Sequence, residues 1–272
     1  AVSAYAHWRQ RDPGAVPLLE VDELAAGRIV NRVLSQERRG RELTETETAE
    51  LLGAYGVRVV PRFPVSSLED ANRVASSLGW NVVLKSTADE LRGRPDLASV
   101  HRNINDPDEM EDAWEDLGLL VSELGLGSRT DQVVSAPVVQ VMAPAGVALQ
   151  IGSREDAAFG PMVSLGLDGI ASELLGDMVY RVPPLTTGDA AVMVRDLKAA
   201  PMLFGRHGSP GVDVEAVQDL IHRVAQLADD HPQLAEVSLR PCIASPAGIS
   251  VLGARVMIAP TGAHRDALAR MV

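Results

Sequence analysis

The chain has 272 residues, and 46% of them are hydrophobic, which is enough to bury one large core or two smaller ones. Its formal net charge of −12 and pI near 4.9 argue against nucleic acid or an anionic membrane surface as a partner. The single cysteine, Cys242, permits no internal disulfide and favours a reducing, cytoplasmic compartment. No apolar run is long enough to span a membrane.

The first forty residues predict a linker followed by a helix. Proline and glycine interrupt the polar stretch 9–20, and Asp22 can cap a helix that runs to about Ser35. The sequence begins at Ala1 without an apolar signal core. We therefore expect a piece cut from a longer protein, with other domains of that parent chain as its partners.

Helices and strands alternate in the next part of the chain. Thr44 and Glu47 form the pattern of a capping box for a helix that ends at Gly56, and Ser66 and Glu69 repeat that pattern. This alternation predicts an α/β layer. In chain order we expect strands at residues 57–60, 80–85 and 99–104, then a helix at 107–124 whose acidic run is a solvated face.

From residue 136 the pattern changes to closely spaced β-runs, followed by two helices and a hairpin at residues 236–256. We therefore place a boundary between two α+β subdomains near residues 130–137. The expected division is a linker and helix at 1–40, an amino-terminal subdomain at 41–135, a carboxy-terminal subdomain at 136–260, and a tail at 261–272.

Two stretches could bind phosphate. Lys85 ends the apolar strand NVVLK, where its ammonium could meet a phosphate or simply reach solvent. GLDGIASE, residues 166–173, could bring backbone N–H groups and an acid, Glu173 or Asp168, to the same ligand, although glycines between strands are usually only turns. The scattered histidines match no zinc pattern, and no GxSxG motif or GNAT acetyl-CoA pattern is present.

Several stretches in order resemble the ATP-grasp domain of NDP-forming acyl-CoA synthetases, relatives of the succinyl-CoA synthetase β-subunit. They are LTETETAELLGAYGVRVVP, NVVLK, VVQVMAPAGVALQIG, FGPMVSLGLDGIASELLGDMVYRVPPLT and AEVSLRPCIASPAGISVLGARV, within residues 40–258. The leading YAHWRQRDPGAVPLL is similar to the joining segment of fused actinobacterial proteins, some of which carry a GNAT acetyltransferase domain.

The resemblance implies an ATP-grasp fold of two α+β subdomains that binds ATP or ADP between them. Lys85 then matches the lysine on the nucleotide phosphates. Gln140, Val141 and Met142 match the strand beside adenine. Gly166, Gly169 and Glu173 match the glycine-rich segment and its acid.

Two motifs depart from the family pattern. The positions that help hold Mg²⁺ on the hairpin are Ser238, Arg240 and Gly253 here, and Arg92 stands where the family has its phosphoryl-carrying histidine. A guanidinium offers no lone pair to a metal, so we expect Mg²⁺ binding at the hairpin to fail.

These departures favour a catalytically inactive ATP-grasp domain that regulates or scaffolds a larger protein, such as one with an acetyltransferase domain. The alternative is an active component of an ADP-forming acyl-CoA ligase whose metal is held by other acids. Arg240 itself could pair with Glu236, which shares its strand face, or take the place of a metal ion at phosphates.

Overall fold

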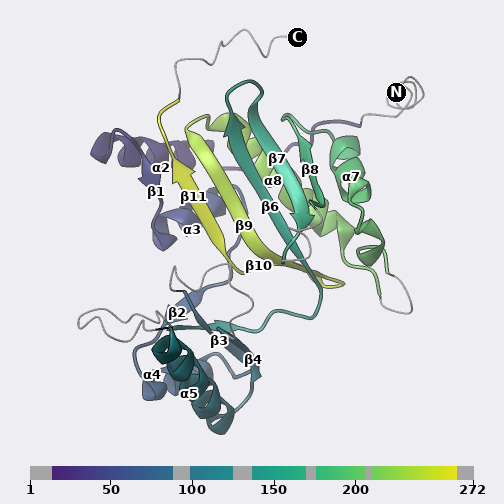
Figure 1. Ribbon diagram of the computed structural model, residues 1–272. Coiled ribbons are helices and arrows are strands. Elements are labelled where there is room, and N and C mark those ends of the chain that lie inside the picture. Colours follow the sequence, from purple (N-terminus) through teal and green to yellow (C-terminus); the bar gives the residue numbers. More distant parts are fainter. Residues whose placement is uncertain (1–13, 88–98, 125–136, 170–175, 206–209, 262–272) are drawn as a thin grey trace. The chain divides into compact units, whose positions relative to one another are not determined.

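The computed structural model describes residues 14–87, 99–124, 137–169, 176–205 and 210–261. Its contacts divide the chain into two compact units (Figure 1). Unit 1 combines residues 1–59 with residues 144–272, and unit 2 is residues 60–143. The division differs from the one expected from the sequence, because residues 41–59 pack with the carboxy-terminal part of the chain and not with the segment that follows them.

Unit 1 contains a seven-stranded antiparallel sheet in the order β1-β11-β9-β6-β7-β8, with β10 also pairing with β9. The amino-terminal strand β1 closes one edge of this sheet by pairing with β11 near the end of the described chain. The strands are β1 (Arg41–Glu42), β6 (Val147–Asp156), β7 (Gly160–Leu167), β8 (Met178–Arg181), β9 (Leu234–Ser245), β10 (Gly248–Val251) and β11 (Ala254–Ile258).

The described helices of unit 1 all cover one face of this sheet, and the other is called the open face below. The apolar sides of the helices bury Val33, Leu52, Met193 and Ile221 against the strands, together with strand residues such as Leu239. The open face is turned to the viewer in Figure 1, with α8 behind the strands. The elements of the covering layer are α2 (Glu23–Gln36), α3 (Glu45–Ala54), α7 (Thr187–Asp196), the 3-10 turn η3 (Ala200–Met202) and α8 (Val214–Asp230).

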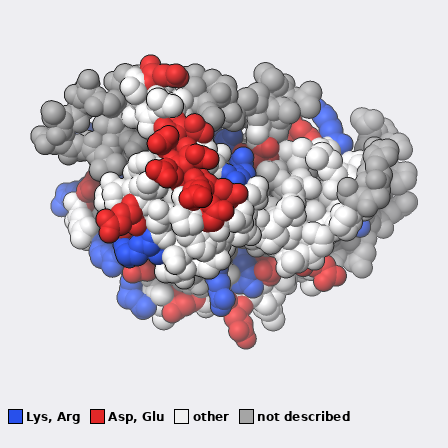
Figure 2. Space-filling view, turned by 90° about the horizontal axis from the view of Figure 1, so that it is seen from below, with Lys and Arg blue, Asp and Glu red and all other residues white. Residues whose placement is uncertain are grey.

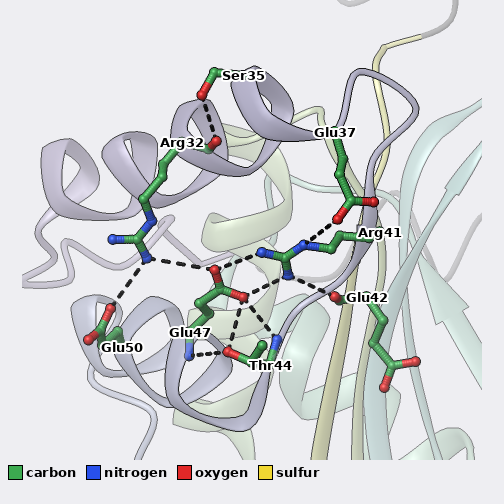
Figure 3. A network of polar contacts seen from close by, with 8 residues as sticks. All are labelled: Arg32, Ser35, Glu37, Arg41, Glu42, Thr44, Glu47 and Glu50. Carbon is green, nitrogen blue, oxygen red and sulfur yellow. Dashed lines mark hydrogen bonds and ion pairs between the residues drawn. The ribbon is translucent and has the colours of Figure 1, made fainter.

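A polar network joins α2, β1 and the start of α3 (Figure 3). Arg41 binds both carboxylate oxygens of Glu47, at 2.7 and 2.9 Å, and also pairs with Glu37. Glu47 completes the predicted capping box by accepting the backbone N–H of Thr44 at 2.9 Å. These contacts hold the pKa of Glu47 at about 2, chiefly through the hydrogen bonds from Arg41.

Unit 2 is a four-stranded antiparallel sheet, β2-β5-β3-β4, covered by two helices. Its core is separate from that of unit 1 and includes Val74, Leu84, Met110 and Val139. The elements are β2 (Arg62–Pro64), α4 (Leu68–Ser77), β3 (Val82–Ser86), β4 (Val100–Ile104), α5 (Pro107–Glu123) and β5 (Pro137–Val141).

Three local predictions were wrong. Residues 57–60 form no named strand, because the only pairing there is an isolated bridge between Val59 and Val251, and the strand forms later as β2. Ser67 caps α4 by accepting from the N–H of Asp70, one residue after the predicted Ser66. The terminal hairpin is three strands, since both β10 and β11 pair with β9.

The acidic face predicted for α5 is confirmed. Its acidic side chains between positions 108 and 116 are all exposed. Figure 2 shows acidic side chains gathered in a band on the face seen from below. Within the described ranges, no helix has both the length and the apolarity needed to cross a membrane.

Candidate functional site

Unit 2 brings together two of the residues predicted to bind nucleotide. Lys85 is half-buried near the end of β3, and its Nζ donates to Oε1 of Gln140 on β5 at 2.7 Å. Gln140 is 1% exposed and donates in turn to the carbonyl of Val60 at 2.8 Å. The amide therefore helps to orient the lysine ammonium beside β5.

The next two predicted residues follow at the end of β5. Val141 is 41% exposed, so its side chain offers an apolar surface. The backbone N–H of Met142 donates to the carbonyl of Asn81 at 3.0 Å, so it is already used within unit 2. A flat apolar group at this end of β5 would meet the Val141 side chain, whereas the N–H of Met142 is already bonded.

In unit 1 the predicted metal positions carry an ion pair. Nε of Arg240, on β9, donates to Oδ1 of Asp168 at 2.7 Å. Asp168 follows β7 directly, and its N–H donates to the carbonyl of Ala148 on the neighbouring strand β6. The Asp168 side chain is 17% exposed and that of Arg240 is 40% exposed, so the pair lies at the sheet surface with the acid partly enclosed.

Arg240 thus pairs with Asp168, and the predicted pair with Glu236 does not form. Glu236 lies on the same face of β9 as Arg240, but its cross-strand neighbour is Arg154 on β6. Sequence reasoning placed Asp168 near a phosphate site and missed this pairing, because the register that brings β7 beside β6 and β6 beside β9 is a tertiary property.

Gly253 lies in the break between β10 and β11, where the backbone comes close to β9. Its carbonyl accepts the N–H of Arg240 at 2.9 Å. A Cβ at position 253 would lie 2.5 Å from the carbonyl oxygen of Arg240, which is too close for a side chain. The glycine is therefore explained by backbone packing, and the arrangement has no space for a carboxylate there.

The remaining predicted positions divide into described and undescribed ones. Gly166 is buried beside Met178, whose Sδ would lie 2.1 Å from an added Cβ. Gly169 has φ +114°, a conformation that favours glycine, and open space around it. Ser238, on β9, lies opposite Gly152 of the neighbouring strand β6, and its side chain is on the open face. Glu173 and Arg92 lie outside the described residues.

Cys242 behaves as the small core residue that its strand setting predicted. It is fully buried, and burial raises the pKa of its thiol, so it is no thiolate nucleophile. Burial also lowers the pKa of His222 and of His231, which favours their neutral forms. Among the described residues, no group of three or more histidine, cysteine or acidic side chains could hold a metal ion.

Comparison with known proteins identifies the family. The sequence profile of the ATP-grasp domain matches residues 33–258. The chain belongs to the ATP-grasp family. Its fold also agrees with that of a Ca. Korarchaeum cryptofilum dinucleotide forming acetyl-coenzyme A synthetase 1 in complex with coenzyme A and Ca-AMPCP, at a TM-score of 0.71 and 30% identity over 86% of this chain and 99% of that one.

Two curated relatives of this ATP-grasp domain are ADP-forming acetate–CoA ligases. It is 30% identical to the acetate–CoA ligase [ADP-forming] I subunit beta of Pyrococcus furiosus, over 88% of this chain and 100% of that subunit. It is also 30% identical to acetate–CoA ligase [ADP-forming] I of Archaeoglobus fulgidus, but the match covers only 34% of that longer enzyme. The chain is therefore related to a β-subunit and spans about a third of the longer enzyme.

The ATP-grasp resemblance implies Mg²⁺ at the hairpin, and the residues there do not fit it. Mg²⁺ takes an octahedral set of oxygen ligands. Arg240 places a cation at this position, Gly253 has no room for a carboxylate, and Ser238 supplies only a hydroxyl. Lys85 and Gln140, which the resemblance assigns to the nucleotide, form an ordered pair within unit 2.

Proposed function

We propose that this ATP-grasp domain binds an adenine nucleotide without a metal at the hairpin and acts as a non-catalytic regulatory or scaffold module. The observation that carries the proposal is the Arg240–Asp168 ion pair at the position where the family resemblance expects metal ligands. A guanidinium can neutralise phosphate oxygens with two directed hydrogen bonds, so it can replace the charge of a metal but not its coordination chemistry.

In the absence of nucleotide, Asp168 holds the guanidinium of Arg240 in place through a hydrogen bond. With its pairing partner 2.7 Å away, Arg240 is held on the open face of the sheet rather than extended into solvent. A phosphate would compete with the carboxylate for the guanidinium. In unit 2, Gln140 orients the Nζ of Lys85, which is a separate candidate for a phosphate contact.

The same substitutions remove catalytic features. Phosphoryl transfer depends on metal ions that bridge phosphate oxygens, and on an acceptor in line with them. Arg92 cannot serve as a phosphoryl acceptor, in contrast to the histidine that the resemblance expects. This combination supports a binding role over the ADP-forming ligation named for the relatives.

The activity of the whole protein follows from its other domains in this proposal. We expect a CoA-binding, succinyl-CoA ligase-like region and a GNAT acetyltransferase domain in the same parent chain, working in the cytoplasm. In that setting nucleotide occupancy of the ATP-grasp domain would report the energy state to the fused enzyme.

Calorimetric titration of the 272-residue chain with ATP and with ADP, each with and without Mg²⁺, tests the proposal. We expect binding that does not strengthen with Mg²⁺. Arg240→Gln and Lys85→Gln should each weaken it about tenfold or more, because each removes a charge-assisted hydrogen bond. The matched control is Arg73→Gln, which removes an exposed arginine ion-paired to Asp70 on α4 and should leave binding unchanged.

Two outcomes contradict the proposal. Binding that requires Mg²⁺, together with acyl-CoA formation by the full-length protein that is lost on Lys85→Ala, would establish an active ligase component. Absence of ATP and ADP binding under all four conditions would leave a purely structural domain.

A further inference from the structure

The open face of the seven-stranded sheet contains a groove with a volume of about 710 Å³, within the size range of small-molecule sites. All of its lining residues belong to unit 1, on β6 to β9 and the turn after β6. One end of the groove is at Arg240. The other end, four residues further along the strands, is roughly 13 Å away and is formed by different side chains.

The floor of the groove is a row of small residues across three strands. Ser164, Gly152 and Ser238 face one another in register, and Tyr180 continues the row on β8. Gly152 lets β6 and β9 approach closely, because a Cβ there would lie 2.3 Å from the carbonyl of Val237. The row therefore forms a hollow with hydroxyl groups along it and the half-exposed ring of Tyr180 at one side.

Opposite charges stand next to this hollow without forming an ion pair. Arg154 on β6 lies directly across from Glu236 on β9, at a separation of about 5 Å between Cα atoms. Such cross-strand pairs usually attract. Here neither side chain has a hydrogen bond or ion pair to any residue in the described part of the chain. Both remain available to a ligand.

We infer that this end of the groove, formed by Arg154, Glu236, Ser164 and Tyr180, binds a small organic acid that carries an oxyanion beside a hydroxyl or ammonium group. The guanidinium of Arg154 takes the carboxylate or phosphate, because its planar donors match two oxygens of either group. Glu236 accepts the neighbouring hydroxyl or ammonium hydrogen. The Ser164 hydroxyl and the Tyr180 ring then contact the remainder of the molecule.

This site goes beyond nucleotide binding and does not depend on it. The nucleotide proposal uses Arg240 and Lys85, whereas the acid-binding end uses Arg154 and Glu236. A variant at Arg154 should therefore leave the ATP titration unchanged. The nucleotide titration and the acid titration therefore test the two proposals separately, and a negative result in one leaves the other standing.

The experiment is a binding titration of the 272-residue chain, monitored through the NMR signals of the protein. Each of its three probes combines an oxyanion with a hydroxyl or an ammonium group. Serine offers a carboxylate and an ammonium, glycerate a carboxylate and a hydroxyl, and glycerol 3-phosphate a phosphate and hydroxyls. Acetate and inorganic phosphate carry the oxyanion alone. Comparing the probes distinguishes a carboxylate ligand from a phosphate ligand.

We expect saturable binding of at least one of the three probes, tighter than that of the matching oxyanion alone. Arg154→Gln should weaken it about tenfold or more, and Glu236→Gln should remove the advantage over the simple oxyanion. Arg102→Gln is the matched control, because Arg102 is also an exposed arginine on a strand, in unit 2. Binding by none of the three probes, or binding that is unchanged in Arg154→Gln, would overturn the inference.

Discussion

At position 253 the backbone decides which residue is tolerated. Because an added Cβ would lie 2.5 Å from the Arg240 carbonyl oxygen, Gly253→Ala must push β9 and the strand break apart. We expect the free energy of unfolding to fall by about 1–3 kcal/mol. Denaturant unfolding followed by circular dichroism measures the change.

The matched substitution is Gly118→Ala, in α5, where nothing lies within 4 Å of the added Cβ. Alanine should be neutral or stabilising there by up to about 1 kcal/mol, because it is the better helix former. Equal effects of the two substitutions would contradict the close approach at Gly253.

Individual residue roles were only partly predictable from sequence. The strand-face alternation of Glu236, Ser238 and Arg240 follows directly from a two-residue period and is confirmed by the burial of Val237 and Leu239 between them. The Asp168–Arg240 pair could not be predicted, since 72 positions separate the two residues and only the order of β7, β6 and β9 brings them together.

The junction of α2, β1 and α3 should respond to acid through Glu47. Its pKa is about 2 in the folded chain against an ordinary value of 4.5, so folding favours the ionised form. The stabilisation is therefore complete above pH 4.5 and is lost as the pH falls from 4.5 towards 2. Glu47→Gln should lower the free energy of unfolding at pH 7 by about 1 kcal/mol, because it weakens the capping box and the Arg41 contact.

Glu47→Gln should also flatten the dependence of stability on pH in this acidic window. Glu50→Gln, on the same helix, is the control, because Glu50 is 54% exposed and its one ion pair among the described residues is with Arg32 at 3.7 Å. Denaturant titrations of both variants between pH 2 and pH 7 provide the comparison. A Glu50 variant with the same loss of stability would contradict a specific role for Glu47.

Whole elements were easier to predict than their ends. The capping box of α3 and the Asp22 cap of α2 were both visible in the sequence, because the interacting positions are only three residues apart. The prediction of a strand at residues 57–60 was wrong. An extended backbone becomes a strand only where a neighbouring segment pairs with it, and the sequence does not show which segment that is.

On the scale of the whole molecule, the two units differ in how the chain builds them. Unit 2 is one continuous stretch, residues 60–143, whereas unit 1 needs both ends of the chain, joined through β1 and β11. Among the described residues, their hydrophobic cores have no member in common. The boundary at residue 136 predicted from the sequence misses the packing of the amino-terminal segment with unit 1. A change in the residue pattern shows where β-strands begin, but it does not show which segments pack together.

This construction predicts that residues 60–143 fold alone. The fragment keeps all four strands of its sheet, both helices and its complete core, and it is longer than the roughly 55–65 residues at which many domains fold alone. We expect a dispersed amide spectrum and a cooperative unfolding transition. The carboxy-terminal fragment 144–272 is the comparison. It should fail to fold cooperatively because it lacks α2, β1 and α3, which supply Val33, Leu52 and the edge pairing with β11. A collapsed spectrum for 60–143, or a well-folded 144–272, would contradict the division, since the core contacts would then not determine which parts of the chain are independent.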